Sequence, residues 1–269
     1  MKKISLIVLT VVSYLLVSII ASAVTDRRNL KDPPTKEITD SPIIISQSKS
    51  IRRIVSNLPK TAVLFFDDGF YNQHVNAFPI LRNYGFTATF GIVTDDIGLE
   101  NANMTFGIMN SQQLINLHEA GMEIASHSVH HPYLTTLADS QVMEELVDSK
   151  STLQGIIGSP GFSFIIPYSD ATSHTLELIN SVYPYYRAVF FAPDFYWIDK
   201  YQSLNTFISY IQGKDVIFLG YHHIVNGASD NGVNPEVFRQ QMQYLYENNY
   251  QVITLRQFMD YVNLYNRYW

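Results

Sequence analysis

The sequence predicts an α/β fold built on a mostly parallel sheet. Short apolar runs typical of buried strands alternate with helical patterns roughly six or seven times along the chain. Conspicuous polar residues directly follow several of these runs, at the strand ends where such folds carry their chemistry. Roughly seven or eight strands over about 210 residues favour a barrel-like closure over an open sheet, and the pattern by itself leaves both possible.

The first elements are the clearest. TAVLFF (61–66) is a short apolar run that predicts a buried strand, and FTATFGIV (86–93) is rich in the β-branched and aromatic residues of strands. Between them, VNAFPILRNYG (75–85) has helical character and ends at a glycine suited to a C-cap. QQLINLHEAG (112–121) predicts a capped helix, and MEIASH (122–127) the next strand.

The second half of the chain continues the alternation. Residues 137–158 predict a long amphipathic helix with Val142, Leu146 and Leu153 facing the core. Asn234 followed by Pro235 marks the start of a late helix. The other expected elements are strands at 161–168, 187–193, 215–223 and 251–254, and helices at 173–183, 236–249 and 255–266.

The N-terminus has the features of an export signal. Lys2 and Lys3 precede a long uncharged apolar run that ends at the small residues Ala21-Ser22-Ala23. We expect residues 1–23 to be a signal peptide, or an uncleaved membrane anchor, because the run is longer than usual. Residues 24–58 are polar and aperiodic and predict an arm or linker.

The composition indicates where the chain works. A net charge of -6 without a basic stripe argues against a nucleic-acid partner. The absence of cysteine excludes disulfides, which fits a bacterial periplasm, cell surface or secreted location better than a disulfide-rich secretome. Anchoring to the inner membrane stays possible. Residues 59–269 are expected to form one domain.

Candidate functional residues gather at the expected strand ends. Asp67 and Asp68 end the first strand, and His127 and His131 lie four residues apart, so that one helical turn would bring their rings together. Two histidines and a carboxylate can hold a metal while leaving coordination positions for water. His222 follows another strand. Surface or packed histidines are the alternative for any one of them, but not for the whole set.

Four segments resemble the polysaccharide deacetylases of the NodB-homology type, carbohydrate esterase family four. They are FFDDG (65–69), HSVHH (127–131), IIPYS (165–169) and LGYHHI (219–224). The first two are specific, whereas the last two are weak alone. The resemblance extends over residues 60–260.

The resemblance implies a distorted (β/α) barrel and a divalent metal, most often Zn²⁺, with Co²⁺, Ni²⁺ or Mn²⁺ as alternatives. It implies Asp68, His127 and His131 as metal ligands. It also implies Asp67 as general base, His222 as general acid, and the backbone N–H of Tyr168 as a donor to the oxyanion. We expect substrate contacts from Phe70, Tyr71, Pro167 and Trp197, although core or lid packing explains Trp197 equally well.

The sequence departs from the family pattern in its third motif. Ile165 stands in place of the usual arginine and Ser169 in place of the glycine. Without that arginine the base lacks a charge partner. Asp194 and Asp199 are candidates to support His222. The expected activity is removal of N-acetyl groups from N-acetylhexosamines of an extracellular or cell-wall polysaccharide. Removal of O-acetyl groups, as from xylan, and non-catalytic glycan binding are the alternatives.

Overall fold

The computed structural model describes residues 58–99, 107–158, 163–183, 185–187, 195–198, 203–226 and 232–268. The expected signal or anchor (1–23), residues 24–57 of the arm, Asp194 and Asp199 lie outside these ranges. Within the described ranges, no helix combines the length and the apolar character that crossing a membrane requires.

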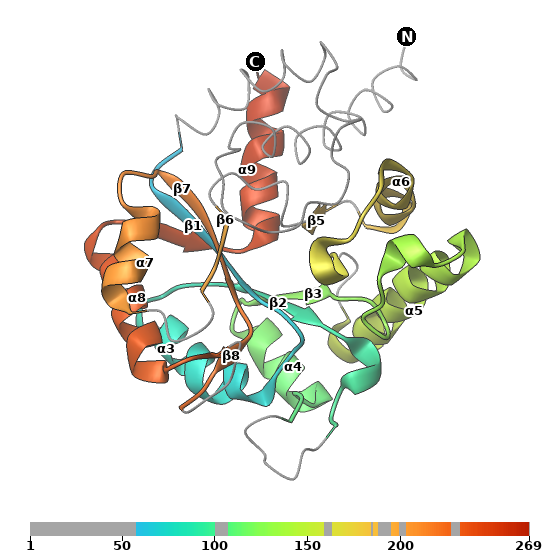
Figure 1. Ribbon diagram of the computed structural model, residues 1–269, viewed down its shortest axis with the longest axis horizontal. Helices are drawn as coiled ribbons and strands as arrows, with labels where there is room; N and C mark the ends of the chain where they lie inside the picture. Colours follow the sequence, from blue (N-terminus) through green and yellow to red (C-terminus); the bar gives the residue numbers. More distant parts are fainter. Residues whose placement is uncertain are drawn as a thin grey trace.

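A parallel sheet forms the centre of the molecule (Figure 1). Its strands run in the order β5-β4-β3-β2-β1-β7-β6, β10 adds to β1, and every pairing is parallel. Their bounds are β1 Thr61–Phe66, β2 Thr89–Ile92, β3 Glu123–Ser126, β4 Ser163–Ile165, β5 Tyr185–Arg187, β6 Phe195–Trp197, β7 Val216–Tyr221 and β10 Gln251–Ile253. The predicted α/β class with mostly parallel strands is confirmed. Among the described residues β5 and β6 are the two ends of the sheet and do not pair with each other.

Strand β1 is the most enclosed element. One of its edges pairs along its whole length with β7, while the other pairs with β10 at Thr61–Val63 and with β2 at Phe65 and Phe66. All six of its side chains are buried. A strand buried on both faces has to be apolar throughout, which explains why TAVLFF reads as a continuous hydrophobic run. The aspartates that follow it are therefore delivered to the centre of one sheet edge.

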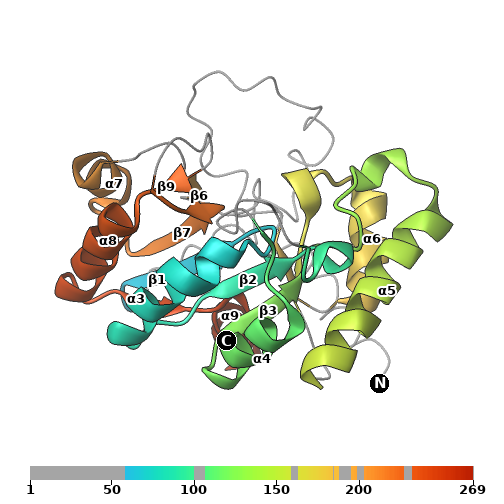
Figure 2. The same cartoon turned by 90° about the horizontal axis from the view of Figure 1, so that it is seen from below.

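Helices cover the sheet on its outer side. They are α3 Phe78–Asn83, α4 Ser111–Glu119, α5 Asp139–Ile157, α6 Ser173–Val182, α7 Leu204–Ile211, α8 Pro235–Glu247 and α9 Leu255–Tyr268. In Figure 2, α3, α7 and α8 lie at the left end of the sheet, and α5 and α6 lie at its right end. α9 contacts both β1 and β5. As predicted, Asn234 caps α8, its Oδ1 accepting the N–H of Glu236 at 2.8 Å.

Short irregular elements complete the site side of the sheet. They are a π-helix η1 (Gln73–Ala77), the 3-10 turns η2 (Thr94–Asp96), η4 (Leu134–Thr136) and η5 (Pro167–Ser169), and the two-residue strands β8 (His223–Ile224) and β9 (Gly232–Val233). Neither α7 nor β6 was expected from the sequence. The segment LNTFISYI is short and apolar, and periodicity cannot separate a buried helix from a strand over eight residues.

Candidate metal and catalytic site

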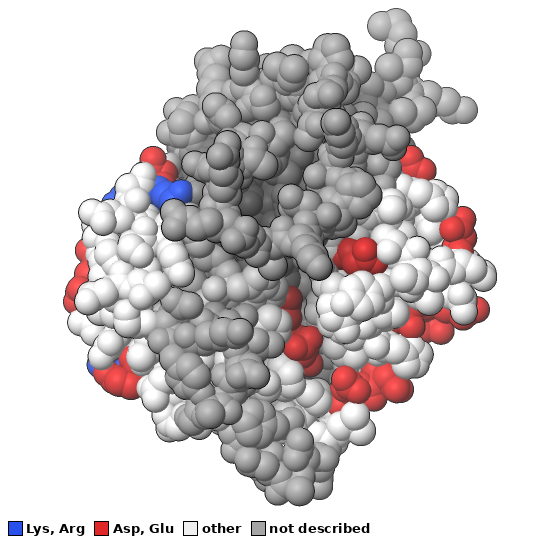
Figure 3. Space-filling model, viewed as in Figure 1, with Lys and Arg blue, Asp and Glu red and all other residues white. Residues whose placement is uncertain are grey.

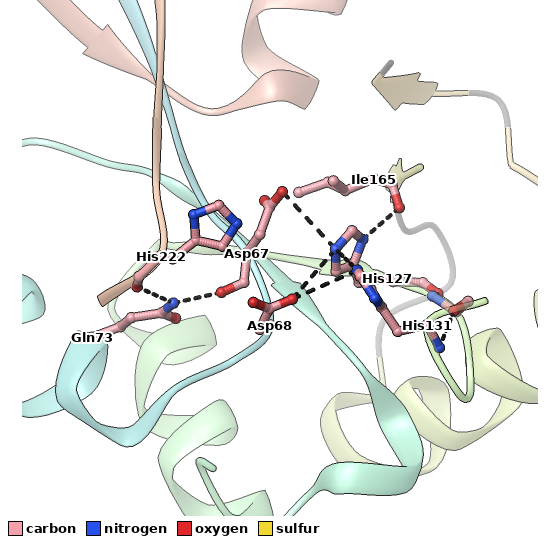
Figure 4. A network of polar contacts seen from close by, with 9 residues as sticks. Asp67, Asp68, Gln73, His127, His131, Ile165 and His222 are labelled. Atoms are coloured by element: carbon pink, nitrogen blue, oxygen red, sulfur yellow. Dashed lines mark hydrogen bonds and ion pairs between the residues drawn. The ribbon is translucent and has the colours of Figure 1, made fainter. Parts of the chain in front are cut away.

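The ends of four strands converge on one site. Asp67 and Asp68 follow β1, His127 follows β3, and His222 follows β7. The carboxyl end of β4 adds the main chain of Ile165. Because parallel strands place their carboxyl ends on one edge of a sheet, residues far apart in the sequence meet here (Figure 4).

Asp68, His127 and His131 are arranged as a three-residue metal site. One ligand atom from each lies within 4.8 Å of the others. The Nε2 atoms of the two histidines are 2.9 Å apart, and Asp68 Oδ1 is 3.7 Å from each. Two nitrogens and a carboxylate oxygen converging on one point are the donor set of a catalytic zinc-type site with open positions.

Hydrogen bonding prepares His127 as a ligand. Its Nδ1 lies 2.7 Å from the carbonyl oxygen of Ile165, and only an N–H can make that bond. The proton is thereby fixed on Nδ1, and the lone pair of Nε2 faces Asp68 and His131. The His127 side chain is only 2% exposed, so its orientation is also fixed by packing.

The protonation of His131 also favours metal binding. Burial, together with the neighbouring His127, lowers the pKa of His131 from 6.5 to about 4. The ring is therefore neutral at neutral pH, as a metal ligand has to be. Burial raises the pKa of the Asp68 carboxyl, with Asp67 adding to this and His222 and His131 opposing it. A cation in the site would favour the ionised carboxylate.

A loop, rather than the expected helical turn, brings the two histidines together. Ser128 and His131 have positive φ values, 69° and 57°, so the backbone reverses between them. Left-handed residues of this kind carry strain and persist where surrounding contacts hold them. The two rings do lie together, as the four-residue spacing predicts, but the helical geometry assumed for it was wrong.

The two adjacent aspartates are not equivalent. Asp68 and Gly69 both have positive φ, 72° and 76°, which turns the chain sharply after Asp67. Asp67 is 3% exposed, and its Oδ2 lies 3.9 Å from His127 Nε2. The Asp68 side chain is 24% exposed and faces the histidine pair. One carboxylate is thus a ligand candidate, while that of its neighbour points in a different direction, toward the Ile165 side chain (Figure 4).

Gln73 joins the aspartate turn to the His222 segment, a role that no pattern in the sequence indicates. Its side-chain Nε2 donates to the carbonyl oxygens of Asp67 at 2.6 Å and His222 at 2.8 Å. The side chain of Gln73 is completely buried in the π-helix η1. π-Helical turns are frequent at functional sites, and this one points an amide between two strand ends.

Aromatic side chains surround the site. Trp197 stacks on His222 with ring centroids 4.4 Å apart, so it belongs to the site rather than to a distant core. Phe70 packs on His223 at 3.7 Å. Tyr71 is half-buried and Pro167 is buried. Trp197 therefore lies against a candidate catalytic residue, whereas a substrate contact from Phe70, Tyr71 or Pro167 stays a prediction.

An exposed pair of tyrosines adds a residue that we did not expect. Tyr168 and Tyr133 stack with centroids 3.9 Å apart and an angle of 10°, and both are about half exposed, at 51% and 52%. The Tyr168 ring also meets the His131 ring edge-on at 4.5 Å. The position of Tyr133 two residues after His131 was the only signal for it in the sequence.

Ile165 fills the position of the family's arginine. Its carbonyl orients His127, and its side chain packs toward β2, where a Cβ on Gly91 would lie 2.9 Å from Ile165 Cδ1 and 3.6 Å from Asp67 Oδ1. A glycine at position 91 therefore lets the β2 backbone approach both residues.

The described surface around the site is acidic. Figure 3 shows acidic side chains over α5 and near the centre of the face, with basic ones at the opposite edge. Asp95 lies 4.0 Å from the His130 ring, next to ligand candidate His131. Negative potential of this kind attracts a divalent cation.

Comparison with known proteins agrees with this geometry. Residues 55–184 match the family model described as polysaccharide deacetylase. This segment belongs to the polysaccharide deacetylase family. One relative is YxkH of Bacillus subtilis, whose name assigns it provisionally to the polysaccharide deacetylases. It is 30% identical to this chain over 118 residues. These residues make up 44% of this chain and 40% of that protein.

Solved structures show the same fold. The peptidoglycan deacetylase PdaC from Bacillus subtilis has a TM-score of 0.56 at 18% identity, covering 77% of this chain and 93% of that one. The Xyl-CE4 domain of a xylanase from a Trinervitermes trinervoides hindgut metagenome has a TM-score of 0.55 at 20% identity, covering 76% and 91%. A mutant of a CE4 family pseudoenzyme has the fold too. Its TM-score is 0.55 at 15% identity, covering 74% of this chain and 67% of that one. The predicted polysaccharide deacetylase fold is confirmed.

Proposed function

We propose that this polysaccharide deacetylase is a metal-dependent hydrolase that removes N-acetyl groups from N-acetylhexosamine units of an extracellular or cell-wall polysaccharide. The observation that carries the proposal is the Asp68–His127–His131 cluster, with Asp67 and His222 beside it at neighbouring strand ends. The reaction is hydrolysis of a linear amide that is not a peptide bond. The glycan is the partner, and no nucleic acid is expected.

The three clustered residues would hold the metal. The His127 tautomer, the neutral His131 and the carboxylate of Asp68 fit a divalent cation, and we propose Zn²⁺, with Co²⁺, Ni²⁺ and Mn²⁺ as alternatives. When bound, such a metal supplies Lewis acidity toward the acetyl carbonyl and lowers the pKa of water to about 7.

The remaining residues would move the protons. Asp67 would accept a proton from the attacking water at its carboxylate, because it lies beside the cluster without belonging to it. His222 would donate a proton to the nitrogen as the C–N bond breaks, since an unprotonated amine leaves poorly. The Tyr168 N–H has no acceptor among the described residues and would donate to the oxyanion.

Removal of O-acetyl groups is the second candidate activity. The same residues would cleave an ester, whose leaving oxygen needs less help from His222 than an amine does. The similarity in fold to the Xyl-CE4 domain of a xylanase keeps this alternative in view. The fold likeness by itself does not choose between the two bonds.

A non-catalytic glycan-binding protein is the third candidate. Ile165 in place of arginine and the existence of a pseudoenzyme with this fold favour it. The complete set of Asp67, His222 and the three ligand candidates argues against it. We further propose that residues 59–269 form the catalytic domain and that residues 1–23 export the chain, with or without retention at the membrane.

The test uses the full chain. Bound metal is measured by elemental analysis, and acetate release is measured on chitooligosaccharides and on acetylated xylan, with Asp67→Asn as the catalytic control. The proposal predicts that the wild-type protein binds metal and releases acetate from chitooligosaccharides. The Asp67→Asn control should still bind the metal but release no acetate. Release from xylan alone would favour the esterase. Bound metal without acetate from either substrate would favour the non-catalytic protein.

A further inference from the structure

Every backbone N–H group of the ligand loop, residues 127–131, has a hydrogen-bond acceptor. The His127 N–H donates to Ile92 O at 2.8 Å, as part of the sheet. The hydroxyl of Ser126, just before the loop, accepts the N–H of Ser128 at 3.2 Å, and the hydroxyl of Ser128 accepts the N–H of His131 at 2.9 Å. The two remaining N–H groups, those of residues 129 and 130, have one common acceptor outside the loop.

That acceptor is the carboxylate of Glu145. Its Oε2 receives the N–H of Val129 at 2.8 Å and the N–H of His130 at 3.0 Å, and its Oε1 lies 2.7 Å from His130 Nδ1. Glu145 projects from α5, and the residue is 8% exposed. Hydrogen bonds to an ionised acceptor are stronger than neutral ones, so the carboxylate is a firm anchor for the loop.

The loop needs such an anchor because of its backbone conformation. Ser128 and His131 are both left-handed, and the peptides that Glu145 holds are those between them. On the opposite side of the loop, the N–H groups of Thr94 and Asp95 donate to the carbonyls of Ser128 and Val129, each at 3.1 Å. The loop is thus held between η2 and α5, and on the α5 side Glu145 accepts two of its N–H groups directly.

We propose that Glu145 is a positioning residue for the metal site: by holding the backbone that precedes His131, it sets the position of His131 Nε2 relative to His127 and Asp68. The inference rests on the proposed metal site, but not on the identity of the substrate. Loss of the carboxylate leaves two adjacent N–H groups without their acceptor and leaves the η2 contacts in place. The loop then stays attached but no longer fixes its ligand.

The experiment measures metal affinity rather than activity. Metal-free full-length protein is titrated with Zn²⁺ against a chromophoric chelator and with Co²⁺ by its visible absorption. The variants are Glu145→Ala and Glu145→Gln, with Glu144→Ala as the matched control, because Glu144 is the exposed neighbour on the same helix. Urea denaturation of each metal-free protein gives its stability, so that affinity is compared between folded proteins.

We expect Glu145→Ala to weaken Zn²⁺ binding about 10- to 100-fold and to change the Co²⁺ spectrum. Glu145→Gln should fall between it and the wild type, because the amide keeps one oxygen for the two N–H groups. Glu144→Ala should bind as the wild type does. If Glu145→Ala does not fold, the Gln variant still has to bind more weakly than the control.

Three results would overturn the inference. Affinity within about threefold of wild type in the folded Ala or Gln variant, with lowered stability, would make Glu145 a purely structural residue of α5. Equal loss in the Glu144 control would show that the effect is not specific. A wild-type protein that binds no metal would remove the basis of the inference and of the proposed function together. Metal binding that depends on Glu145, without acetate release, would refute only the proposed function.

Discussion

The hydrogen bonds of Gln73 give a prediction whose magnitude can be worked out from the structure. Its Nε2 donates to the main-chain carbonyls of Asp67 and His222, and its side chain is completely buried. Met has a similar length and shape but no donor, so Gln73→Met removes both bonds while filling the same space. The two strand ends that carry the proposed base and acid then lose their direct link.

Two opposing effects determine how much Gln73→Met changes the free energy of unfolding. Each buried carbonyl that loses its donor costs about 1–3 kcal/mol. Against this, Gln73 Oε1 is itself buried without a donor among the described residues, and Met removes that unfavourable group. We therefore expect Gln73→Met to lower the free energy of unfolding by about 2 kcal/mol.

A glutamate at the same position sharpens the test. In Gln73→Glu a buried carboxylate would face two carbonyl oxygens, so this variant should be less stable than Gln73→Met at pH 7. Its pKa in the folded state would be raised above that in the unfolded state. The missing stability should therefore return progressively as the pH falls from 7 toward about 4.3, the ordinary pKa of glutamate, because the protonated acid can donate to one carbonyl.

The assay is urea denaturation of the metal-free full-length protein at pH 7 and at pH 5, with unfolding monitored by circular dichroism. Gln112→Met is the control, because Gln112 is exposed on α4 and its side chain donates to Asn116 Oδ1 on the same helix at 3.1 Å. The control should stay within about 0.5 kcal/mol of wild type. The reasoning is refuted if Gln73→Met is equally unaffected, or if the Glu variant is no worse than the Met variant at pH 7.

Further predictions concern the site and its surroundings. Asp68→Asn should weaken Zn²⁺ binding at least about 100-fold, whereas Asp67→Asn should bind Zn²⁺ and lose acetate release; equal metal loss in both would contradict the assigned roles. Tyr133→Ala should raise KM several-fold on a glycan substrate at unchanged Zn²⁺ affinity, because it removes half of the exposed aromatic stack with Tyr168; a fall in kcat alone would argue against a binding role. Burial raises the pKa of Tyr183 from 10 to about 12. The unfolded chain therefore loses this proton first, and stability should fall by about 2 kcal/mol as the pH rises from 10 to 12. Tyr183→Phe should flatten that part of the pH profile measured by urea denaturation.

Much of the fold could be predicted because its signals are local. TAVLFF is apolar throughout because β1 is buried on both faces and shared among three neighbours. The cap at Asn234 and the long helix α5 follow from residues adjacent in sequence. α7 could not be predicted, since an apolar segment of eight residues has no period that separates helix from strand.

The candidate site, like the fold, is predictable only in part from the sequence. The sequence by itself determined the residue types: paired aspartates after a buried strand, two histidines four apart, and a histidine after a later strand. Those residues carry the chemistry in their side chains, so their pattern is visible along the chain.

Only the tertiary structure decided how these groups are held. Gln73 reaches the carbonyl of His222 across 149 positions, and His127 takes its tautomer from the carbonyl of Ile165, 38 positions away. Glu145 lies 16 and 15 positions beyond the two residues whose N–H groups it accepts, among other acidic residues that look the same in sequence. Main-chain acceptors and donors are present at every residue, so no sequence pattern marks the ones that packing brings to a site.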